Sequence, residues 1–528
     1  MSASDKDFRP KARRPRGFQD RRGASLARER ALVAKISKVY EDWGFEALET
    51  GAFEYADALG KFLPDQDRPN EGVFALEDDD DQWMALRYDL TAPLARFVAE
   101  HYDGLPKPYR RWAAGPVWRN EKPGPGRFRE FWQCDADTVG SASPAADAEM
   151  IAMACAAYEA AGIPRTNFRI KISSRGILDG ALEAAALVGE EHQAKRLTVL
   201  RTLDKIDRLG WRGVELLLGH GRKDDSGDFT EGARLSAEQI QIFERFIVNT
   251  QNLRFHSSGL NTATEMERRG ELPPIRNFTG EVAMPDQEMT IRAWGEVVGS
   301  TEAGKRGLDE LNEILALLRG PFDVGPGRAY LDGSVVRGLE YYTGTVFEAE
   351  LLGRDALRNP VQLGSIGGGG RYDDLVARFT GQKIPATGFS IGVSRLAAAL
   401  EAGEANAQPT DGPIAILPFD KDGMSECFAF AARLRKENLK AEVYLGGAGP
   451  KAQLKYADRR NAPVAVILGG DERAQGQVTL KDLKLGAQRA KNVADNKEWR
   501  EGGAAQITVP QDELEGAVSR ILSSQRGA

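Results

Sequence analysis

Hydrophobic and polar positions recur with clear periods along most of this chain. Residues 25–43 carry apolar side chains at helical spacing, so we predict an amphipathic helix that ends at Gly44. A short strand is expected from Phe45 to Leu48. Residues 71–76 and 83–88 alternate around five consecutive acidic residues, which predicts a β-hairpin with a solvated acidic turn.

A second hairpin is predicted where the aromatic-rich segments 109–119 and 128–139 alternate on either side of a loop with Gly and Pro. Ser143 and Pro144 then begin a helix that runs to Ala161. In the strand that follows, apolar side chains alternate at Phe168, Ile170 and Ile172. This order of elements predicts an α+β body built on an antiparallel sheet.

The pattern changes over residues 176–322, where leucines recur at helical spacing. Because strand patterns resume at Arg328, we interpret this part as an inserted, mostly helical domain. Residues 299–306 nearly spell a phosphate-binding P-loop. Arg306 stands where Ser or Thr would hold magnesium, and no buried strand leads into the segment, so we discount that interpretation.

The last part of the chain follows a Glu/Ala/Asn/Gln/Pro linker at residues 401–411. Strand and helix patterns then alternate β-α-β-α-β as far as Leu468, which predicts a small parallel-type α/β domain.

Composition excludes several classes of protein. Charged residues make up 28% and apolar residues 41%, and without a run of eighteen apolar residues we expect no membrane span. The N-terminus is basic and polar, so we expect no secretory signal. The three cysteines, Cys134, Cys155 and Cys427, are too far apart for a CxxC pair, which fits a reduced cytoplasm.

The charge is unevenly distributed. The whole chain has a net charge of -7, but residues 1–30 hold ten Lys or Arg against four Asp or Glu, and residues 412–528 balance at +3. Basic ends on an acidic body are compatible with local docking of a polyanion. For residues 1–14, a solvated basic tail is an equally good interpretation.

Candidate chemistry is densest at residues 336–348. Arg337, two tyrosines and two carboxylates stand there among glycines and β-formers, which suits a pocket at a strand edge for a small polar ring and an anionic group. An amphipathic strand with its charges in water is the alternative. The segment resembles the histidine-binding signature of histidyl-tRNA synthetases.

Further segments extend this resemblance. Residues 118–133 and 388–395, the latter interpreted as a helix, look like the second and third signature motifs of class II aminoacyl-tRNA synthetases. A dinucleotide loop is the alternative for the glycines at 367–370, but no matching acidic residue follows a second strand. Residues 15–20 match a further histidyl signature, and residues 451–458 and 467–483 resemble an anticodon-binding domain. Together with 86–94, the motifs span roughly residues 13–490.

The resemblance implies a class II antiparallel-sheet catalytic core with a helical insertion and a C-terminal α/β anticodon-binding domain. The implied boundaries are 1–175 and 323–400 for the two parts of the core, 176–322 for the insertion, 401–411 for the linker and 412–528 for the last domain. A homodimer is implied as well. Gly51 replaces the proline usual in the first class II motif, which affects where the dimer interface is placed.

The implied reaction joins ATP and L-histidine to histidyl-adenylate and then transfers histidine to tRNA(His). Positioned guanidinium groups suit it, because a charge-rich phosphoryl transition state must be stabilised. The resemblance makes Arg119, Arg337 and Arg395 catalytic, and it assigns nucleotide contacts to Arg119, Glu121, Arg127, Phe131 and Arg395. Mg2+ would accompany ATP, and the sequence identifies no metal ligands.

The histidine site implied by the resemblance spreads over three segments. Asp89 and Thr91, with Leu90 between them, would hold the α-amino group, and Gln133 would orient the same end. Asp137 and a hydroxyl of Tyr341 or Tyr342 would pair the imidazole nitrogens, and Arg337 would complete the set. A site with paired polar groups rejects apolar isosteres strongly.

Two alternatives to a histidine–tRNA ligase remain. The first is the histidine-sensing regulatory paralogue of ATP phosphoribosyltransferase, which typically lacks the anticodon-binding domain and the catalytic residues. The second is a sister synthetase for proline, threonine or glycine, which would not carry the residues at 337–342. The loop at 122–126, which the family uses to read the acceptor end of tRNA, also departs from the common bacterial form.

Overall fold

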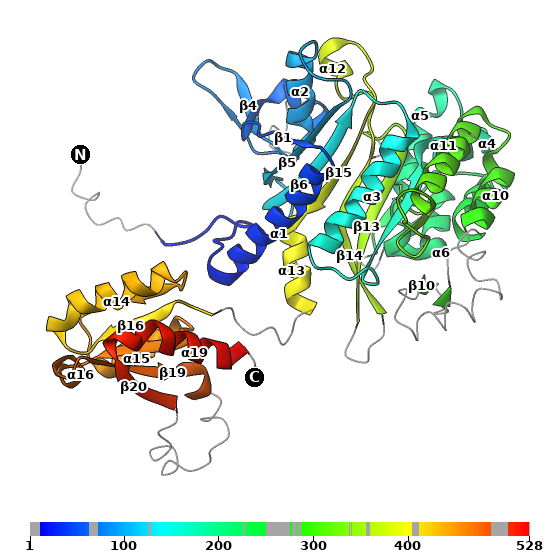
Figure 1. Cartoon of the computed structure of the whole chain (residues 1–528). Coiled ribbons are helices and arrows are strands. Elements are labelled where there is room, and N and C mark those ends of the chain that lie inside the picture. Colours follow the sequence, from blue (N-terminus) through cyan, green and yellow to red (C-terminus); the bar gives the residue numbers. More distant parts are fainter. Residues whose placement is uncertain are drawn as a thin grey trace. The chain divides into compact units, whose positions relative to one another are not determined.

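The computed structural model describes residues 11–62, 72–124, 128–224, 227–249, 275–276, 282–283, 287–336, 338, 341–354, 360–403, 411–486 and 505–526. The chain divides into two compact units, Met1–Ala405 and Asn406–Ala528 (Figure 1). In the described part, no helix is both long and apolar enough to cross a membrane.

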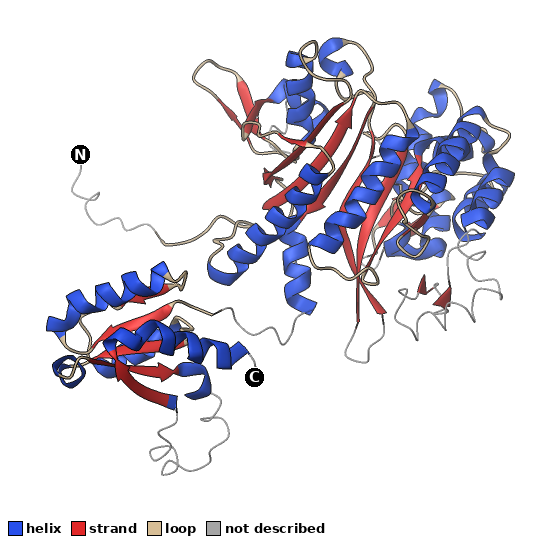
Figure 2. Cartoon of the chain, in the orientation of Figure 1, coloured by secondary structure: helices blue, strands red, loops and turns tan. Residues whose placement is uncertain are grey.

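An eight-stranded sheet forms the centre of the first unit (Figure 2). Its order is β1-β5-β6-β15-β14-β13-β7-β12, in which the inner pairs are antiparallel and the two edge strands pair in parallel. The strands are β1 (Glu46–Ala47), β5 (Tyr109–Trp118), β6 (Glu130–Val139), β7 (Phe168–Ser174), β12 (Ala329–Leu331), β13 (Thr345–Arg354), β14 (Pro360–Arg371) and β15 (Ala386–Gly392).

Strand alternation gives this sheet one apolar and one polar face. On the apolar face Cys134, Ile170, Phe347 and Phe389 are fully or almost fully buried in one hydrophobic core. Helices cover that face, as Figure 1 shows for three of them: α1 (Gly23–Asp42), α3 (Pro144–Ala160) and α13 (Val393–Gly403). Tyr40 of α1 is fully buried there because its ring fills the space beside β6.

The polar face is also buried, which the sequence did not predict for β7. Arg169 and Lys171 alternate with the apolar side chains of that strand, yet they are only 9% and 5% exposed. Both pair with Glu350 on β13, at 3.4 Å for Arg169 Nε and 2.5 Å for Lys171 Nζ. The charges therefore face buried partners rather than water.

The glycine run at 367–370 lies in β14, not in a loop. A Cβ on Gly369 would come within 2.8 Å of the Phe347 ring, and one on Gly370 within 2.9 Å of Tyr342. Aromatic rings therefore occupy the space where side chains of this strand would stand. Residues 388–392 form part of β15, and only α13 after them is helical, so the interpretation of 388–395 as one helix is wrong. Phe389 and Ile391 alternate with Ser390 at the period of a strand.

The helices of the segment 176–322 share the hydrophobic core of the sheet. They are α4 (Arg175–Ala184), α5 (Gln193–Leu203), α6 (Ile206–Leu218), α7 (Ala237–Glu244), α10 (Gln287–Val298) and α11 (Glu302–Arg319). Helices α4 and α11 cross closely, since a Cβ on Gly180 would lie 2.7 Å from the Cα of Gly304. Gly304 of the P-loop-like segment thus allows close helix packing, and Thr301 caps α11 by accepting from Gly304 N.

A small sheet of order β2-β4-β3 precedes α2 (Thr91–His101) in the chain. Its strands are β2 (Phe53–Tyr55), β3 (Ala75–Glu77) and β4 (Trp83–Leu86). The predicted acidic hairpin is present, and Asp78 closes its turn by accepting from Asp80 N and Gln82 N. By register Phe53, Tyr55 and Leu76 share one face, where they remain 43%, 55% and 43% exposed.

The second unit has its own core around a sheet of order β17-β16-β18-β19-β20. The predicted β-α-β-α-β order is present, and two antiparallel strands extend the sheet. Its elements are β16 (Ile414–Pro418), α14 (Met424–Lys436), β17 (Ala441–Val443), α15 (Pro450–Arg459), β18 (Val464–Leu468), α16 (Gly470–Ala474), β19 (Gln477–Asp482), β20 (Gln506–Pro510) and α19 (Leu514–Arg526).

Candidate active site

On the polar face of the large sheet, two paired strands, β5 and β6, carry a row of polar side chains. Gln133, Asp135 and Asp137 project from the same face of β6, and register places Arg111 of β5 opposite Asp137. All four side chains are buried. Such a row of buried polar groups is stable only when hydrogen bonds and opposite charges compensate it.

Asp137 is the most fully compensated member of the row. Arg111 Nη2 lies 2.8 Å from Asp137 Oδ2, and the Tyr372 hydroxyl donates to Oδ1. Burial raises the pKa of Asp137, and Arg111 and the Tyr372 hydroxyl oppose that rise. The neighbouring Gly388 of β15 has no side chain because a Cβ there would clash with the Asp137 carboxylate.

Arg111 also connects this row to the segment before α2. The same Nη2 donates to the carbonyl of Leu90 at 2.8 Å. Asp89 Oδ1 accepts from the backbone N–H groups of Thr91 at 3.1 Å and Ala92 at 2.9 Å, so the carboxylate shapes the start of the helix. Burial raises the pKa of Asp89, whereas these backbone donors and Arg119 lower it.

Gln133 marks the other end of the row. Its Nε2 donates to Ser390 Oγ on β15 at 2.7 Å, which fixes the amide, and its Oε1 has no hydrogen-bond partner among the described residues. A buried amide oxygen of this kind is available to a donor on a ligand. Ser394, at the start of α13, accepts from Trp132 N at 3.0 Å and so ties that helix to β6.

Aromatic rings lie beside Asp137. The centroids of Tyr341 and Tyr342 are 5.1 Å apart in an edge-on arrangement, and Tyr341 is 5.2 Å from Tyr372. Burial raises the pKa of Tyr341 and Tyr372 far above the usual tyrosine value, so both hydroxyls stay protonated and can donate. The hydroxyl that donates to Asp137 Oδ1 is that of Tyr372, which was not among the predicted tyrosines.

Arg119 follows β5 and stands over an aromatic ring. Its guanidinium carbon is 5.1 Å from the centroid of Phe131, and its Nε donates to the Tyr88 carbonyl at 3.1 Å. A guanidinium and an aromatic ring placed together offer a base a cation and a planar surface on which to stack. Glu121 is exposed, and its backbone carbonyl accepts from Arg129 Nε at 3.0 Å.

The structure therefore brings several predicted residues together. Arg111 contacts Leu90 and Asp137 and acts on Asp89, Ser390 holds Gln133, and Tyr372 contacts Asp137 and Tyr341. Arg395 is exposed in the first turn of α13. Arg337 and Arg127 lie outside the described residues.

Sequence reasoning missed three side chains of this site: Arg111, Asp135 and Tyr372. The first two stand at alternate positions of predicted strands, so the period of two was a usable signal for the polar face. Tyr372 lies two residues after the glycines at 367–370, and it had no predicted role.

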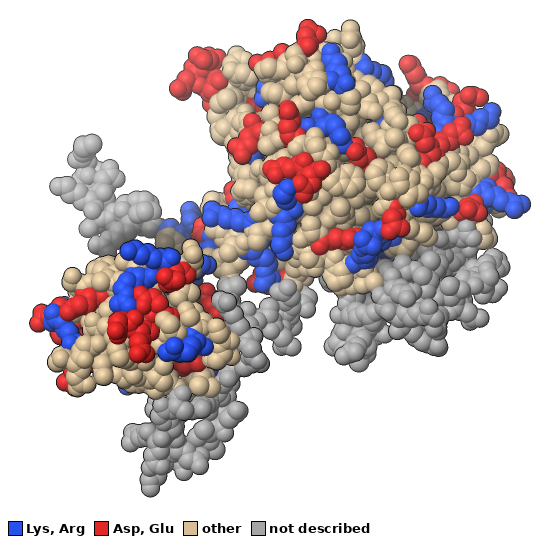
Figure 3. Space-filling model, in the orientation of Figure 1, with Lys and Arg blue, Asp and Glu red and all other residues tan. Residues whose placement is uncertain are grey.

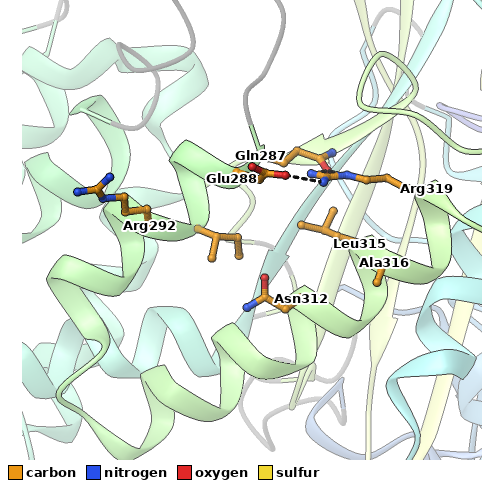
Figure 4. Close-up of a pocket in the computed structure, with 8 residues that line it drawn as sticks. Gln287, Glu288, Arg292, Asn312, Leu315, Ala316 and Arg319 are labelled. Carbon is orange, nitrogen blue, oxygen red and sulfur yellow. Dashed lines mark hydrogen bonds and ion pairs between the residues drawn. The ribbon is translucent and has the colours of Figure 1, made fainter.

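A separate cavity of about 300 Å3 lies between α10 and α11 (Figure 4). Arg319 on its wall donates to Gln287 Oε1 at 2.7 Å and 3.1 Å and reaches Glu288 at 3.4 Å. Gln287 Nε2 in turn donates to the Ala329 carbonyl. These polar groups are occupied by one another, and none of the predicted site residues lines the cavity.

Comparison with known proteins gives two family matches. A family model described as histidyl-tRNA synthetase matches residues 17–215 and 261–396, and a model described as anticodon binding domain matches residues 413–518.

Curated and solved relatives extend over nearly the whole chain. The chain is 55% identical over 519 residues to the histidine–tRNA ligase of Caulobacter vibrioides, covering 98% of each. It is 51% identical to that of Rhodopseudomonas palustris strain BisB18, covering 97% of this chain and 96% of that one. The crystal structure of histidyl-tRNA synthetase from Nostoc sp. PCC 7120 matches 97% of this chain and all of that one, with TM-score 0.67 and 26% identity.

One solved structure bears on the regulatory alternative. It is described as an ATP phosphoribosyltransferase regulatory subunit/histidyl-tRNA synthetase from Bacillus halodurans C, and it matches 88% of this chain with TM-score 0.63 and 21% identity. At that identity the likeness shows a common fold alone. The full-length matches at about half identity decide the family and confirm the predicted fold class, and the chain belongs to the histidyl-tRNA synthetase family.

Proposed function

We propose that this chain ligates L-histidine to tRNA(His) at the expense of ATP. One observation carries the proposal: curated relatives 48% to 55% identical over nearly the whole chain are named histidine–tRNA ligase. The comparisons favour this ligase over the regulatory paralogue, because these relatives match both the catalytic part and the segment that fits an anticodon-binding domain.

The first step consumes ATP. A histidine carboxylate oxygen attacks the α-phosphorus, the bond to the β-phosphate oxygen breaks, and pyrophosphate leaves with its electron pair. We propose that Arg119, Arg337 and Arg395 stabilise the added negative charge, since fixed cations in a dry site need little reorganisation. The Arg119 guanidinium carbon already lies 5.1 Å from the centroid of the Phe131 ring, so the pair offers a nucleotide a cation beside an aromatic surface. Mg2+ would enter as MgATP, and we assign it no protein ligands.

The second step transfers histidine to tRNA. A terminal ribose hydroxyl attacks the adenylate carbonyl, AMP leaves, and the hydroxyl proton passes to a basic oxygen. In the pocket, Gln133 Oε1 and the segment 89–91 would hold the α-ammonium group. Asp137 and a tyrosine hydroxyl would pair the imidazole nitrogens.

We propose the following division of labour along the chain. Residues 1–175 and 323–400 form the catalytic core, 176–322 the insertion, 401–411 a linker and 412–528 the part that reads the anticodon. Acidic and basic side chains are interspersed on the visible faces of both units (Figure 3), so shape and local contacts must guide the tRNA as well as net charge. We expect a cytoplasmic enzyme.

A homodimer is part of the proposal. Phe53, Tyr55 and Leu76 share an exposed face of the small sheet, and a contiguous apolar surface of that kind favours a protein partner. We take the partner to be a second copy of this chain.

Transfer of labelled histidine to tRNA tests the proposal. The full chain with MgATP should charge tRNA with histidine, and Arg119→Ala should lower the rate about 100-fold or more while the protein stays folded. Charging at the normal rate by the folded variant would remove Arg119 from the mechanism. No charging by the native chain would overturn the proposed function.

A further inference from the structure

Asp135 lies in the middle of the polar row on β6 and is 1% exposed. Its cross-strand neighbours are Ala113 on β5 and Ser390 on β15, so small side chains flank the carboxylate. Among the described residues, neither carboxylate oxygen accepts a hydrogen bond of ordinary geometry. The Ser390 hydroxyl, which accepts from Gln133 Nε2, lies near enough to lower the pKa of Asp135.

Asp135 has charged neighbours but no direct donor among them. Buried carboxylates of Asp89, Asp135 and Asp137 lie in the fields of the guanidinium groups of Arg87, Arg111 and Arg119. Asp137 has Arg111 and the Tyr372 hydroxyl as direct partners, and Asp89 has two backbone donors. Asp135 shares the field of Arg111 but has no direct donor of this kind.

A buried carboxylate in this position holds a proton more firmly than one in water. Burial raises the pKa of Asp135 to about 7, Arg111 opposes the rise, and Asp137 adds to it. Asp135 interacts electrostatically with charged or titratable groups from several elements. They are Arg87, Asp89, Arg111, Asp137, Cys134 and Tyr40. Among the described residues, the Asp135 carboxylate therefore keeps both oxygens open to a cationic donor on a ligand.

We propose that Asp135 is a further substrate-binding residue whose carboxylate receives the α-ammonium group of histidine. The inference rests on the proposed function. The α-ammonium group is a cation with three donors, whereas a neutral imidazole brings one N–H, which Asp137 is placed to accept. Gln133, two residues away on the same face, stands at the end of the pocket assigned to that ammonium group. The bound cation then replaces the proton on Asp135.

Calorimetric titration of L-histidine into the full chain tests this. At pH 8 Asp135 is ionised, and Asp135→Asn should weaken binding about 10- to 100-fold, the range for a hydrogen bond to a charged group. At pH 6 native Asp135 must first lose its proton, so the difference between the two proteins should shrink by about tenfold. Titrations in two buffers of different ionisation enthalpy should show more protons released by the native chain than by the variant at pH 6, and equal numbers at pH 8.

A ligand without the ammonium group isolates the contact. Imidazole-4-propanoate keeps the imidazole and the carboxylate, so Asp135→Asn should leave its inhibition constant against histidine-dependent exchange unchanged. Equal weakening of histidine and of this analogue would overturn the assignment to the ammonium group. Unchanged histidine binding by the variant at pH 8 would overturn the inference altogether.

A matched variant separates binding from a structural role. Glu350 is a buried carboxylate on the same sheet face, but Lys171 and Arg169 compensate it directly. Glu350→Gln should lower stability and keep histidine affinity, whereas Asp135→Asn should keep stability and lose affinity. The reverse result for Asp135→Asn would make it a structural partner of Arg111. If the native chain binds no histidine, the proposed function itself fails.

Discussion

Arg111 is the cation on which the buried polar row depends, and its replacement by Met should be the most damaging single change in that row. The side chain is fully buried, and its Nη2 serves both Asp137 Oδ2 and the Leu90 carbonyl at 2.8 Å. Removing one partner of a buried ion pair typically costs about 3–5 kcal/mol, because the other charge stays buried. We expect a loss of that size at pH 8 in the free energy of unfolding of the first unit.

The loss should depend on pH. Burial raises the folded pKa of Asp135 and Asp137, and Arg111 holds both down, so its removal raises them further above the unfolded value. A carboxylate with a raised folded pKa binds its proton more tightly in the folded state, so stability falls as pH rises from about 4 towards the folded pKa. Arg111→Met should therefore be less damaging at pH 6 than at pH 8, by about 1.4 kcal/mol per pH unit for each group that titrates.

Urea unfolding followed by tryptophan fluorescence measures this, since Trp112, Trp118 and Trp132 lie on β5 and β6. The matched variant is Asp137→Asn, alone and combined with Arg111→Met. Two groups in direct contact should couple by about 2 kcal/mol. The double variant should therefore lose about 2 kcal/mol less unfolding free energy than the two single losses added together. Additivity within about 0.5 kcal/mol, or a loss that does not change between pH 6 and pH 8, would refute the reasoning.

Three further predictions follow from the proposed function. Arg337→Ala should reduce adenylate formation about 100- to 1000-fold, roughly 3–4 kcal/mol, without unfolding the chain, and near-normal pyrophosphate exchange would exclude it from the mechanism. A chain ending at Asp411 should still form the adenylate but charge tRNA poorly, mainly through a higher KM for tRNA, and unchanged charging would argue against anticodon reading by residues 412–528. Tyr55→Glu should reduce the mass measured by light scattering from that of a dimer, whereas Phe229→Glu, at a side chain 57% exposed outside the small sheet, should not. A native mass of 57.7 kDa with full activity would exclude an obligate dimer.

Local patterns predicted much of the fold because they depend on neighbours in sequence. The helix at 25–43, the acidic hairpin and the β-α-β-α-β order of the last unit follow from spacing, turn residues and caps such as Ser143, which accepts from Ala145 N. The spacing of residues along the chain does not show which strands pair in the sheet. The glycines at 367–370 suggest a loop until β14 is placed between β13 and β15, where aromatic rings fill the space above them.

The same limit applies to the site. Asp137 and Gln133 were found through a resemblance, but the partners that hold them come from distant segments. Tyr372 is 235 positions from Asp137, and Ser390 is 257 from Gln133. Arg111 had no role before the register of β5 and β6 placed it opposite Asp137. Which charged side chains are buried can be told only from the assembled fold, as for Lys171 and Glu350.

Amino-acid-dependent exchange of pyrophosphate into ATP measures directly which amino acid this chain activates. The full chain should be assayed with MgATP and each of the twenty amino acids in turn, because adenylate formation and its reversal need only the first unit's chemistry. We expect exchange with histidine alone, since an apolar amino acid would leave the buried polar groups of Asp137, Gln133 and the tyrosines unpaired. Exchange with another amino acid in place of histidine, or no exchange by the folded chain, would contradict it.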